Sequence, residues 1–130
     1  FISTLLGGWD TGLATLCIVM AVDYITGWIV AGVFKNSEKS ESGGLSSSAG
    51  FKGLAKKGVM LLFVLVAYRL DLTVGSTYIR DAVIIAFIAN EVISITENAG
   101  LMGIPIPTVI IKAIDVLKND DKKGKGDTDE

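Results

Sequence analysis

The residues of this sequence that could do chemistry are a few acidic, amide and hydroxyl side chains set inside long apolar segments. Asp23 lies near the middle of the first apolar run. Five polar side chains follow at helical spacing in a later run: Asn90, Glu91, Ser94, Glu97 and Asn98. An ionised carboxylate at the centre of a bilayer costs about 2.5–3.5 kcal/mol on insertion scales, so it is expected to face another helix or water. Two interpretations remain open, hydrogen bonds between helices or the wall of an aqueous pathway.

Other kinds of chemistry have no basis in the sequence. The chain has no histidine, and Cys17 is its single cysteine, so an intrachain disulfide, a Cys/His metal site and histidine-based catalysis are excluded. The Gly-Gly pairs stand outside any phosphate-binding pattern. A net charge of −2 gives no basic field for nucleic acid. We therefore expect no enzyme, no cofactor and no nucleic-acid partner.

Half of the residues are hydrophobic, and they are gathered in runs that predict membrane-spanning helices at residues 13–34, 58–74 and 81–99. The first would be about 33 Å long as a helix, enough for a hydrocarbon core of about 30 Å. The second is near the lower length limit for a span, and the third is the most polar. The predicted fold class is an all-α integral membrane protein with three transmembrane helices.

The segments after the third run predict a break, a short helix and a tail. Pro105 and Pro107 forbid a continuous helix where they stand. Residues 108–118 have apolar side chains on one face and are too short to span, which predicts an amphipathic helix on the membrane surface. Residues 119–130 contain no apolar side chain and are expected to be a charged, disordered tail. The membrane domain would thus cover residues 1–118.

The lysines predict the orientation of the chain. Five lie within residues 35–57, a predicted loop rich in serine, glycine and charge, and five more lie from Lys112 onward. Two predicted spans separate these groups, so both fall on one side, which the positive-inside rule makes the cytoplasm. Lys52, Lys56 and Lys57 are the cytoplasmic basic group at the headgroups. The amino terminus is then outside.

Polar and small residues also share one face of the first helix. One side of the first helix carries Thr15, Val19, Asp23, Thr26 and Val30. Gly27 and Ala31 form a small-xxx-small pair beside it, which permits close helix contact. Arg69 and Asp71, near the far end of the second helix, are expected to reach the outer interface. Three short helices cannot enclose a pore, so an aqueous pathway would need an oligomer.

Three stretches resemble motifs of the small phage holins of Gram-positive bacteria, a family that includes the clostridial toxin-secretion holins. They are VDYITGWIVAG (22–32), SSSAGFKGLAKKG (46–58) and NEVISITENAGLMGIPIP (90–107). The resemblance runs from about residue 13 to residue 117, and the third motif is the most specific. Its motif positions in this chain are Asp23, Gly27, Glu91, Ser94, Glu97, Asn98, Pro105 and Pro107.

The resemblance implies a bacteriophage lysis protein. Such a holin accumulates in the host cytoplasmic membrane, forms a homo-oligomer and opens pores through which an endolysin, or a toxin, leaves the cell. A non-conducting antiholin or a membrane anchor could share the same helices, and an antiholin is also a potential partner. A small ion channel is a third alternative, although selectivity usually requires a defined ring of ligands and this polar stripe is broad and mixed.

Overall fold

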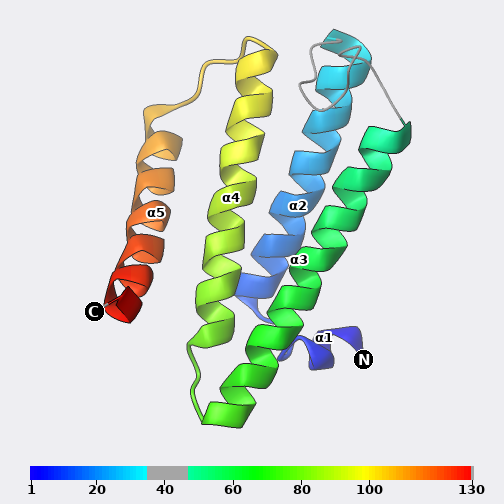
Figure 1. Cartoon of the computed structure of the whole chain (residues 1–130). Helices are drawn as coiled ribbons and strands as arrows, with labels where there is room; N and C mark the ends of the chain where they lie inside the picture. The colour runs from blue at the N-terminus through cyan, green and yellow to red at the C-terminus, as the bar shows by residue number, and fades with distance from the viewer. Residues whose placement is uncertain (35–46, 130) are drawn as a thin grey trace.

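The computed structural model describes residues 1–34 and 47–129, with side chains as far as residue 119, and every regular element in these ranges is helical (Figure 1). The elements are α1 (Ile2–Leu5), α2 (Thr11–Ile29), a π-helical turn η1 (Val30–Phe34), α3 (Ser47–Val74), α4 (Ile79–Leu101) and α5 (Thr108–Asp129). The prediction of an all-α chain is confirmed for this part of the sequence.

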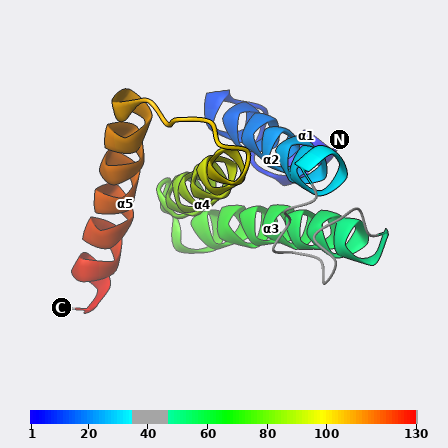
Figure 2. The same cartoon turned by 90° about the horizontal axis from the view of Figure 1, so that it is seen from above.

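Helices α2, α3 and α4 form an up-down-up bundle, in which α4 packs against both of the others (Figures 1 and 2). Its core is made of apolar side chains that recur every three or four residues on the facing sides of the helices. They are Leu6, Leu13, Leu16, Met20, Met60, Val64 and Ile84. Large apolar side chains also cover the outside, among them Leu62, Phe63 and Val66 on α3. Helices that are apolar all round are typical of segments with no aqueous surface.

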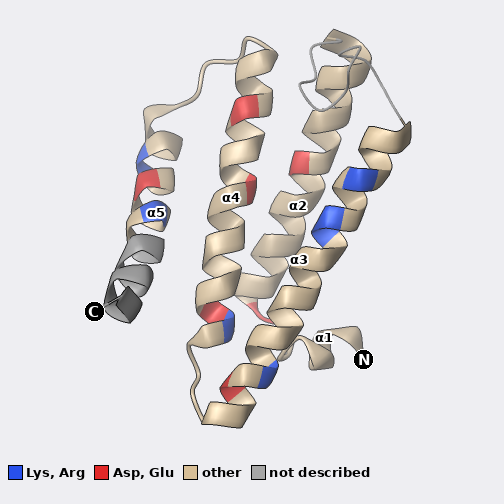
Figure 3. Ribbon diagram, in the orientation of Figure 1, with Lys and Arg blue, Asp and Glu red and all other residues tan. Residues whose placement is uncertain are grey.

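One helix in the described part of the chain, Thr11–Phe34, is long and apolar enough to cross a membrane by length and composition. It joins α2 and η1. The apolar stretches of α3 and α4 contain charged side chains, and those of α3 gather toward its two ends (Figure 3). Spanning by α3 and α4 therefore stays a prediction.

The start of α3 differs from the predicted loop at residues 35–57, because the helix already begins at Ser47. Alanine, leucine and lysine in this stretch are good helix formers. Gly50 also lets α3 approach α2 closely: the Tyr24 hydroxyl donates to the Gly50 carbonyl oxygen at 3.2 Å. A Cβ atom at Gly50 would lie 3.0 Å from the Trp28 ring. Residues 35–46 of the predicted loop lie outside the described residues.

The C-terminal segment also differs from its prediction. Helix α5 continues to Asp129 instead of ending at residue 118, so the structure is helical where a disordered tail was predicted. No proline follows Pro107, so the sequence has no strong helix breaker of this kind beyond it. Residues between α4 and α5 contain both prolines. Helix α5 packs beside α4 and buries Ile114 (Figures 1 and 2).

Candidate functional site

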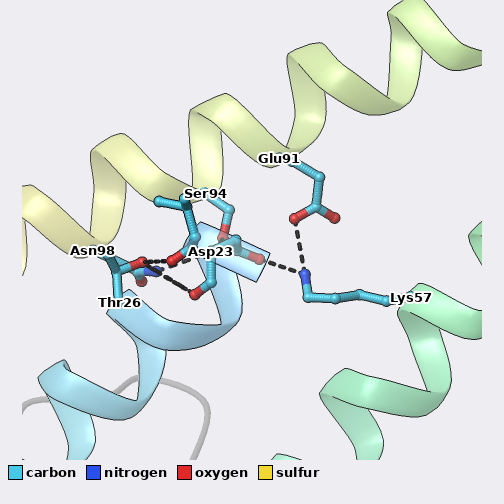
Figure 4. Close-up of polar contacts among 7 residues, drawn as sticks. Asp23, Thr26, Lys57, Glu91, Ser94 and Asn98 are labelled. Atoms are coloured by element: carbon cyan, nitrogen blue, oxygen red, sulfur yellow. Dashed lines mark hydrogen bonds and ion pairs between the residues drawn. The ribbon is translucent and has the colours of Figure 1, made fainter. Parts of the chain in front are cut away.

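The centre of the candidate site is a lysine shared by two acids from different helices (Figure 4). The Lys57 ammonium on α3 lies 2.7 Å from Asp23 Oδ2 on α2 and 2.8 Å from Glu91 Oε2 on α4. The side chains of Lys57, Asp23 and Glu91 are 13%, 5% and 7% exposed. Both carboxyl groups thus contact the same ammonium. Three ionisable groups therefore meet inside the bundle, away from solvent.

Neutral polar side chains complete this arrangement around Asp23. The Ser94 hydroxyl donates to Asp23 Oδ1 at 2.5 Å. The Asn98 amide donates to the same oxygen at 3.2 Å and to Thr26 Oγ1 at 2.8 Å. We call the six residues Asp23, Thr26, Lys57, Glu91, Ser94 and Asn98 the Asp23–Lys57 network. No buried side-chain nitrogen or oxygen in the described residues lacks a hydrogen-bond partner.

The network is the polar continuation of the apolar core. On α2, Asp23 follows Leu16 and Met20 on the buried face. On α3, Lys57 precedes Met60 and Val64 at the same three- and four-residue spacing. The same spacing places Glu91, Ser94 and Asn98 on one side of α4. Each helix thus turns one face inward, apolar at one end and polar toward the other.

The remaining residues of the polar stripes lie elsewhere. Asn90 and Glu97 are exposed on α4. The Thr15 hydroxyl donates to the Thr11 carbonyl of its own helix at 2.7 Å. Gly27 is half-buried on α2, one turn after Asp23. The structure therefore brings together five of the nine residues proposed from sequence for pore or helix contacts.

Lys57 is the network member that the sequence analysis assigned elsewhere. It was grouped with Lys52 and Lys56 as a headgroup lysine, but only those two are exposed. The signal that separates Lys57 is its register with Met60 and Val64, which puts it on the buried face of α3. Periodicity across the end of the apolar run could therefore have found it.

A second buried polar cluster lies at the opposite end of the bundle, where the chain enters α2 and α4. The Arg80 guanidinium donates to the Leu6 carbonyl, to the Gly8 carbonyl at 2.9 Å and to Asp10 Oδ2 at 2.7 Å. Gly7 has a φ of +96°, which favours glycine, and a Cβ there would lie 2.6 Å from Arg80 Nε. The amino-terminal segment is therefore fastened to α4 by one side chain.

Asp71 organises the turn of this second cluster. Its Oδ1 accepts from the Ser76 hydroxyl at 2.5 Å and from the Ile79 N–H at 2.9 Å, and its Oδ2 accepts from the Arg80 N–H at 2.9 Å. Asp71 thus caps the first turn of α4, a role that Tyr78, next to the helix start, does not fill. The sequence analysis expected Asp71 to reach the outer membrane interface, and the structure buries its side chain against the start of α4. We call Asp10, Asp71, Ser76 and Arg80 the Arg80 cluster.

Asp10 is the exposed member of the Arg80 cluster. The hydrogen bond from Arg80 is the main cause that holds the pKa of Asp10 below its ordinary value, and the Leu13 N–H acts in the same direction. Within residues 1–34 and 47–119, no group of three or more acidic or thiol side chains forms a metal-ligand set. Both clusters are therefore suited to joining helices by hydrogen bonds and ion pairs.

Comparison with known proteins gives one consistent result. A model of the bacteriophage holin family matches residues 1–119. An uncharacterized protein of Halalkalibacterium halodurans is 36% identical over 128 residues, which cover 94% of this chain and 89% of that protein. An uncharacterized protein of Clostridium perfringens is 38% identical, over 87% of this chain and 81% of its own length. A probable holin of Bacillus phage phi105 is 33% identical, over 88% and 82% respectively. No solved structure matches the chain.

Proposed function

Because this chain belongs to the bacteriophage holin family, we propose that it is a holin that oligomerises in the bacterial cytoplasmic membrane and opens holes. The holes release an endolysin, or a toxin, and so lead to lysis or secretion. The observation that carries this proposal is the Asp23–Lys57 network, an ionic core enclosed by helices whose outer surfaces are apolar. A wall that is polar on one side and apolar on the other is what a hole in a bilayer requires.

We propose that α2 with η1, α3 and α4 all cross the membrane. The up-down-up arrangement supports this placement, because it brings the exposed Lys52 and Lys56 to the same end as the link between α4 and α5 (Figures 1 and 3). The amino terminus and the turn between α3 and α4, which contains Gly75, lie at the other end (Figure 1). The positive-inside rule makes the lysine end cytoplasmic, with the amino terminus outside and the carboxyl terminus inside. The predicted position of α5 on the cytoplasmic membrane surface would require it to separate from α4, beside which it packs in the structure (Figure 1).

Hole formation would require the helices of one chain to exchange partners. In the single chain the polar faces of α2 and α4 are turned toward each other, and water has little access to them. If α4 separated from α2 within an oligomer, Asp23, Glu91 and Ser94 would line an aqueous lumen while the apolar faces stayed in lipid. Several copies are needed, since three helices have no room for a lumen. The partners in this account are other copies of the chain and the bilayer.

The proposal is tested by inducible expression in bacteria, with and without an endolysin that lacks an export signal. Culture turbidity and release of a large cytoplasmic enzyme are followed. We expect abrupt growth arrest with escape of the enzyme, and lysis when the endolysin is present. Loss of membrane potential without enzyme release would instead indicate a small channel. Correct insertion with no effect, together with inhibition of a functional holin on co-expression, would indicate an antiholin.

The role of the network is tested in the same cells with Glu91→Leu. This variant should still insert but should change the time of lysis, because Lys57 on α3 loses the carboxyl group that it contacts on α4. Glu97→Leu is the matched control, since Glu97 lies on the same helix and is exposed. Unchanged lysis timing in Glu91→Leu would exclude a functional role of the network.

A further inference from the structure

Helix α4 carries an amide on the outer surface of the bundle. Asn90 is the central residue of α4, about 16 Å from each end at 1.5 Å per residue. It directly precedes Glu91, so its side chain leaves the helix about 100° away from that member of the Asp23–Lys57 network. Asn90 is exposed although α5 packs beside α4. In the membrane placement proposed above, its amide faces the lipid tails near the middle of the bilayer.

Asn90 differs in this respect from hydroxyl side chains of the same bundle. The Thr15, Thr73 and Thr96 hydroxyls each donate to a backbone carbonyl of their own helix, at 2.7 to 2.8 Å. The Asn90 amide has no hydrogen-bond partner among the described residues. Lipid tails cannot supply one, and an amide without a partner in an apolar medium is strongly unfavourable. A partner outside this bundle would remove that cost.

A second copy of the chain offers a matching partner. A carboxamide carries both N–H donors and a carbonyl acceptor, so two Asn90 side chains can donate to each other. Two copies inserted in the same direction are related by a rotation axis along the bilayer normal, which places both Asn90 residues at the same depth. Ala86 and Ala82 lie one and two turns before Asn90 on the same side of α4, and small side chains let two helix backbones approach closely.

We propose that α4 pairs with α4 of a second copy through reciprocal hydrogen bonds between their Asn90 amides. The pairing rests on the proposed function, in which α4 crosses the membrane and copies of the chain assemble. Glu97, exposed on the same side of α4, lies near the end of the helix, where water reaches its charge. The pairing leaves the Asp23–Lys57 network closed, because Asn90 is on the outer surface. Closed bundles therefore meet through Asn90 before their helices exchange partners.

The pairing is tested by energy transfer between donor-labelled and acceptor-labelled copies of the full chain in phosphatidylcholine vesicles. The labels are attached at Lys52→Cys, an exposed position, in a chain whose own cysteine is replaced by Cys17→Ser. We expect Asn90→Leu to weaken association by roughly tenfold, which is the effect of losing interhelical hydrogen bonds in a bilayer. Unchanged association in Asn90→Leu would overturn the proposal.

Two further variants separate the amide pair from a general effect of polarity. Asn90→Gln keeps the donors and the acceptor, so it should associate like the unaltered chain. Thr73→Val removes an exposed hydroxyl that is already bonded within its own helix, so it should also leave association unchanged. An Asn90→Gln chain as weak as Asn90→Leu, or an equal loss in Thr73→Val, would contradict the pair. Circular dichroism checks that the helices form in every variant.

Disulfide crosslinking tests which helix faces meet. In the Cys17→Ser chain, Ala86→Cys should give a covalent dimer on mild oxidation, because it lies one turn from Asn90 on the same side of α4. Leu62→Cys, at an exposed apolar position on α3, is the control and should crosslink much less. Equal crosslinking at the two positions, or more at Leu62→Cys, would place the contact elsewhere and overturn the proposal.

These measurements separate the α4 pairing from the proposed function, because association and crosslinking are measured without hole formation. A chain that pairs through Asn90 but releases no enzyme from cells would keep this interface and remove the holin. Enzyme release by a chain whose association is the same with Asn90→Leu would keep the holin and remove the interface.

Discussion

Arg80 at one end of the bundle and Lys57 nearer the other are both buried cations, but their charges are balanced in different ways. Arg80 donates to two backbone carbonyls and to Asp10, whose side chain is 50% exposed. Lys57 contacts two carboxyl groups that are themselves buried. Water can adjust the charge balance of the first cluster through Asp10. In the second, the ammonium and both carboxyl groups are nearly removed from solvent, so the two clusters should respond differently to substitution and to pH.

The largest change in the free energy of unfolding is expected on replacing Lys57. Lys57→Met removes the ammonium that Asp23 and Glu91 share, and loss of one partner of a buried ion pair costs about 3–5 kcal/mol. The free energy of unfolding, measured by detergent titration with circular dichroism, should fall by about this amount near pH 8. The decrease in the free energy of unfolding should be smaller at about pH 5, because the acids can then take up protons at less cost.

Lys56→Met is the matched control, because Lys56 is exposed and precedes Lys57 directly. Its free energy of unfolding should change by less than about 0.5 kcal/mol at either pH. A pH-independent loss in Lys57→Met would show that packing of the lysine stem, rather than charge balance, is what the site requires.

A smaller effect is expected at the other cluster. Arg80→Met removes the hydrogen bonds that fasten the amino-terminal segment, at a cost of about 2–4 kcal/mol, reduced because Asp10 is left facing water. The segment before α2 should become susceptible to limited proteolysis while the three-helix bundle stays folded. Arg69→Met, an exposed arginine on α3, should leave both measurements unchanged. Equal susceptibility in the two variants would show that Arg80 does not hold this segment.

The close approach of the chain to Arg80 can be tested with two neighbouring glycines. Gly7 and Gly8 both have positive φ, but only Gly7 has atoms within 4 Å of a Cβ position. Gly8→Ala should therefore cost about 1 kcal/mol from backbone strain alone. Gly7→Ala should cost about 2–3 kcal/mol, because its Cβ also meets Arg80 and Tyr68. Equal unfolding free energies in the two variants would contradict the packing of Arg80 against Gly7.

The smallest expected effect is the acid response of Asp10. Because its pKa is lowered in the folded chain, the Arg80–Asp10 contact stabilises at pH above the ordinary value and is lost as pH falls through the lowered one. The loss should stay below about 1 kcal/mol, since Asp10 is half exposed. Proteolysis of the amino-terminal segment should rise at acid pH and be independent of pH in Asp10→Asn.

Sequence reasoning found the acids of the network but not their partner. Asp23, Glu91 and Ser94 stand out because they are polar within apolar runs. Lys57 stands at the edge of a run, where a lysine is equally compatible with the headgroups, and only the packing of α3 beside α2 decides its direction. The same holds for Asp71: the cap that it supplies comes from eight residues before Ile79, beyond the range of local capping patterns.

Helix existence was more predictable than helix length. The apolar runs gave α2, α3 and α4, because burial and periodicity decide where such helices form. The start of α3 at Ser47 is accompanied by the contact of Gly50 with Tyr24, which joins residues far apart in the chain and so leaves no local pattern in the sequence. The extension of α5 to Asp129 depends on helix propagation through charged residues, which composition alone presents as a solvated tail.

The chain has two tryptophans, one where α2 contacts α3 and one next to Asp10 of the Arg80 cluster. Trp28 packs against Tyr24, with ring centroids 5.9 Å apart, and over Gly50 on α3. Trp9 stands next to Asp10 and is exposed. The molecule therefore carries its own optical reporters: in a chain with Trp9→Phe, a change in fluorescence emission would follow the separation of α2 from α3 in real time. With Trp28→Phe instead, the fluorescence emission would come from Trp9 and would follow only the release of the amino-terminal segment.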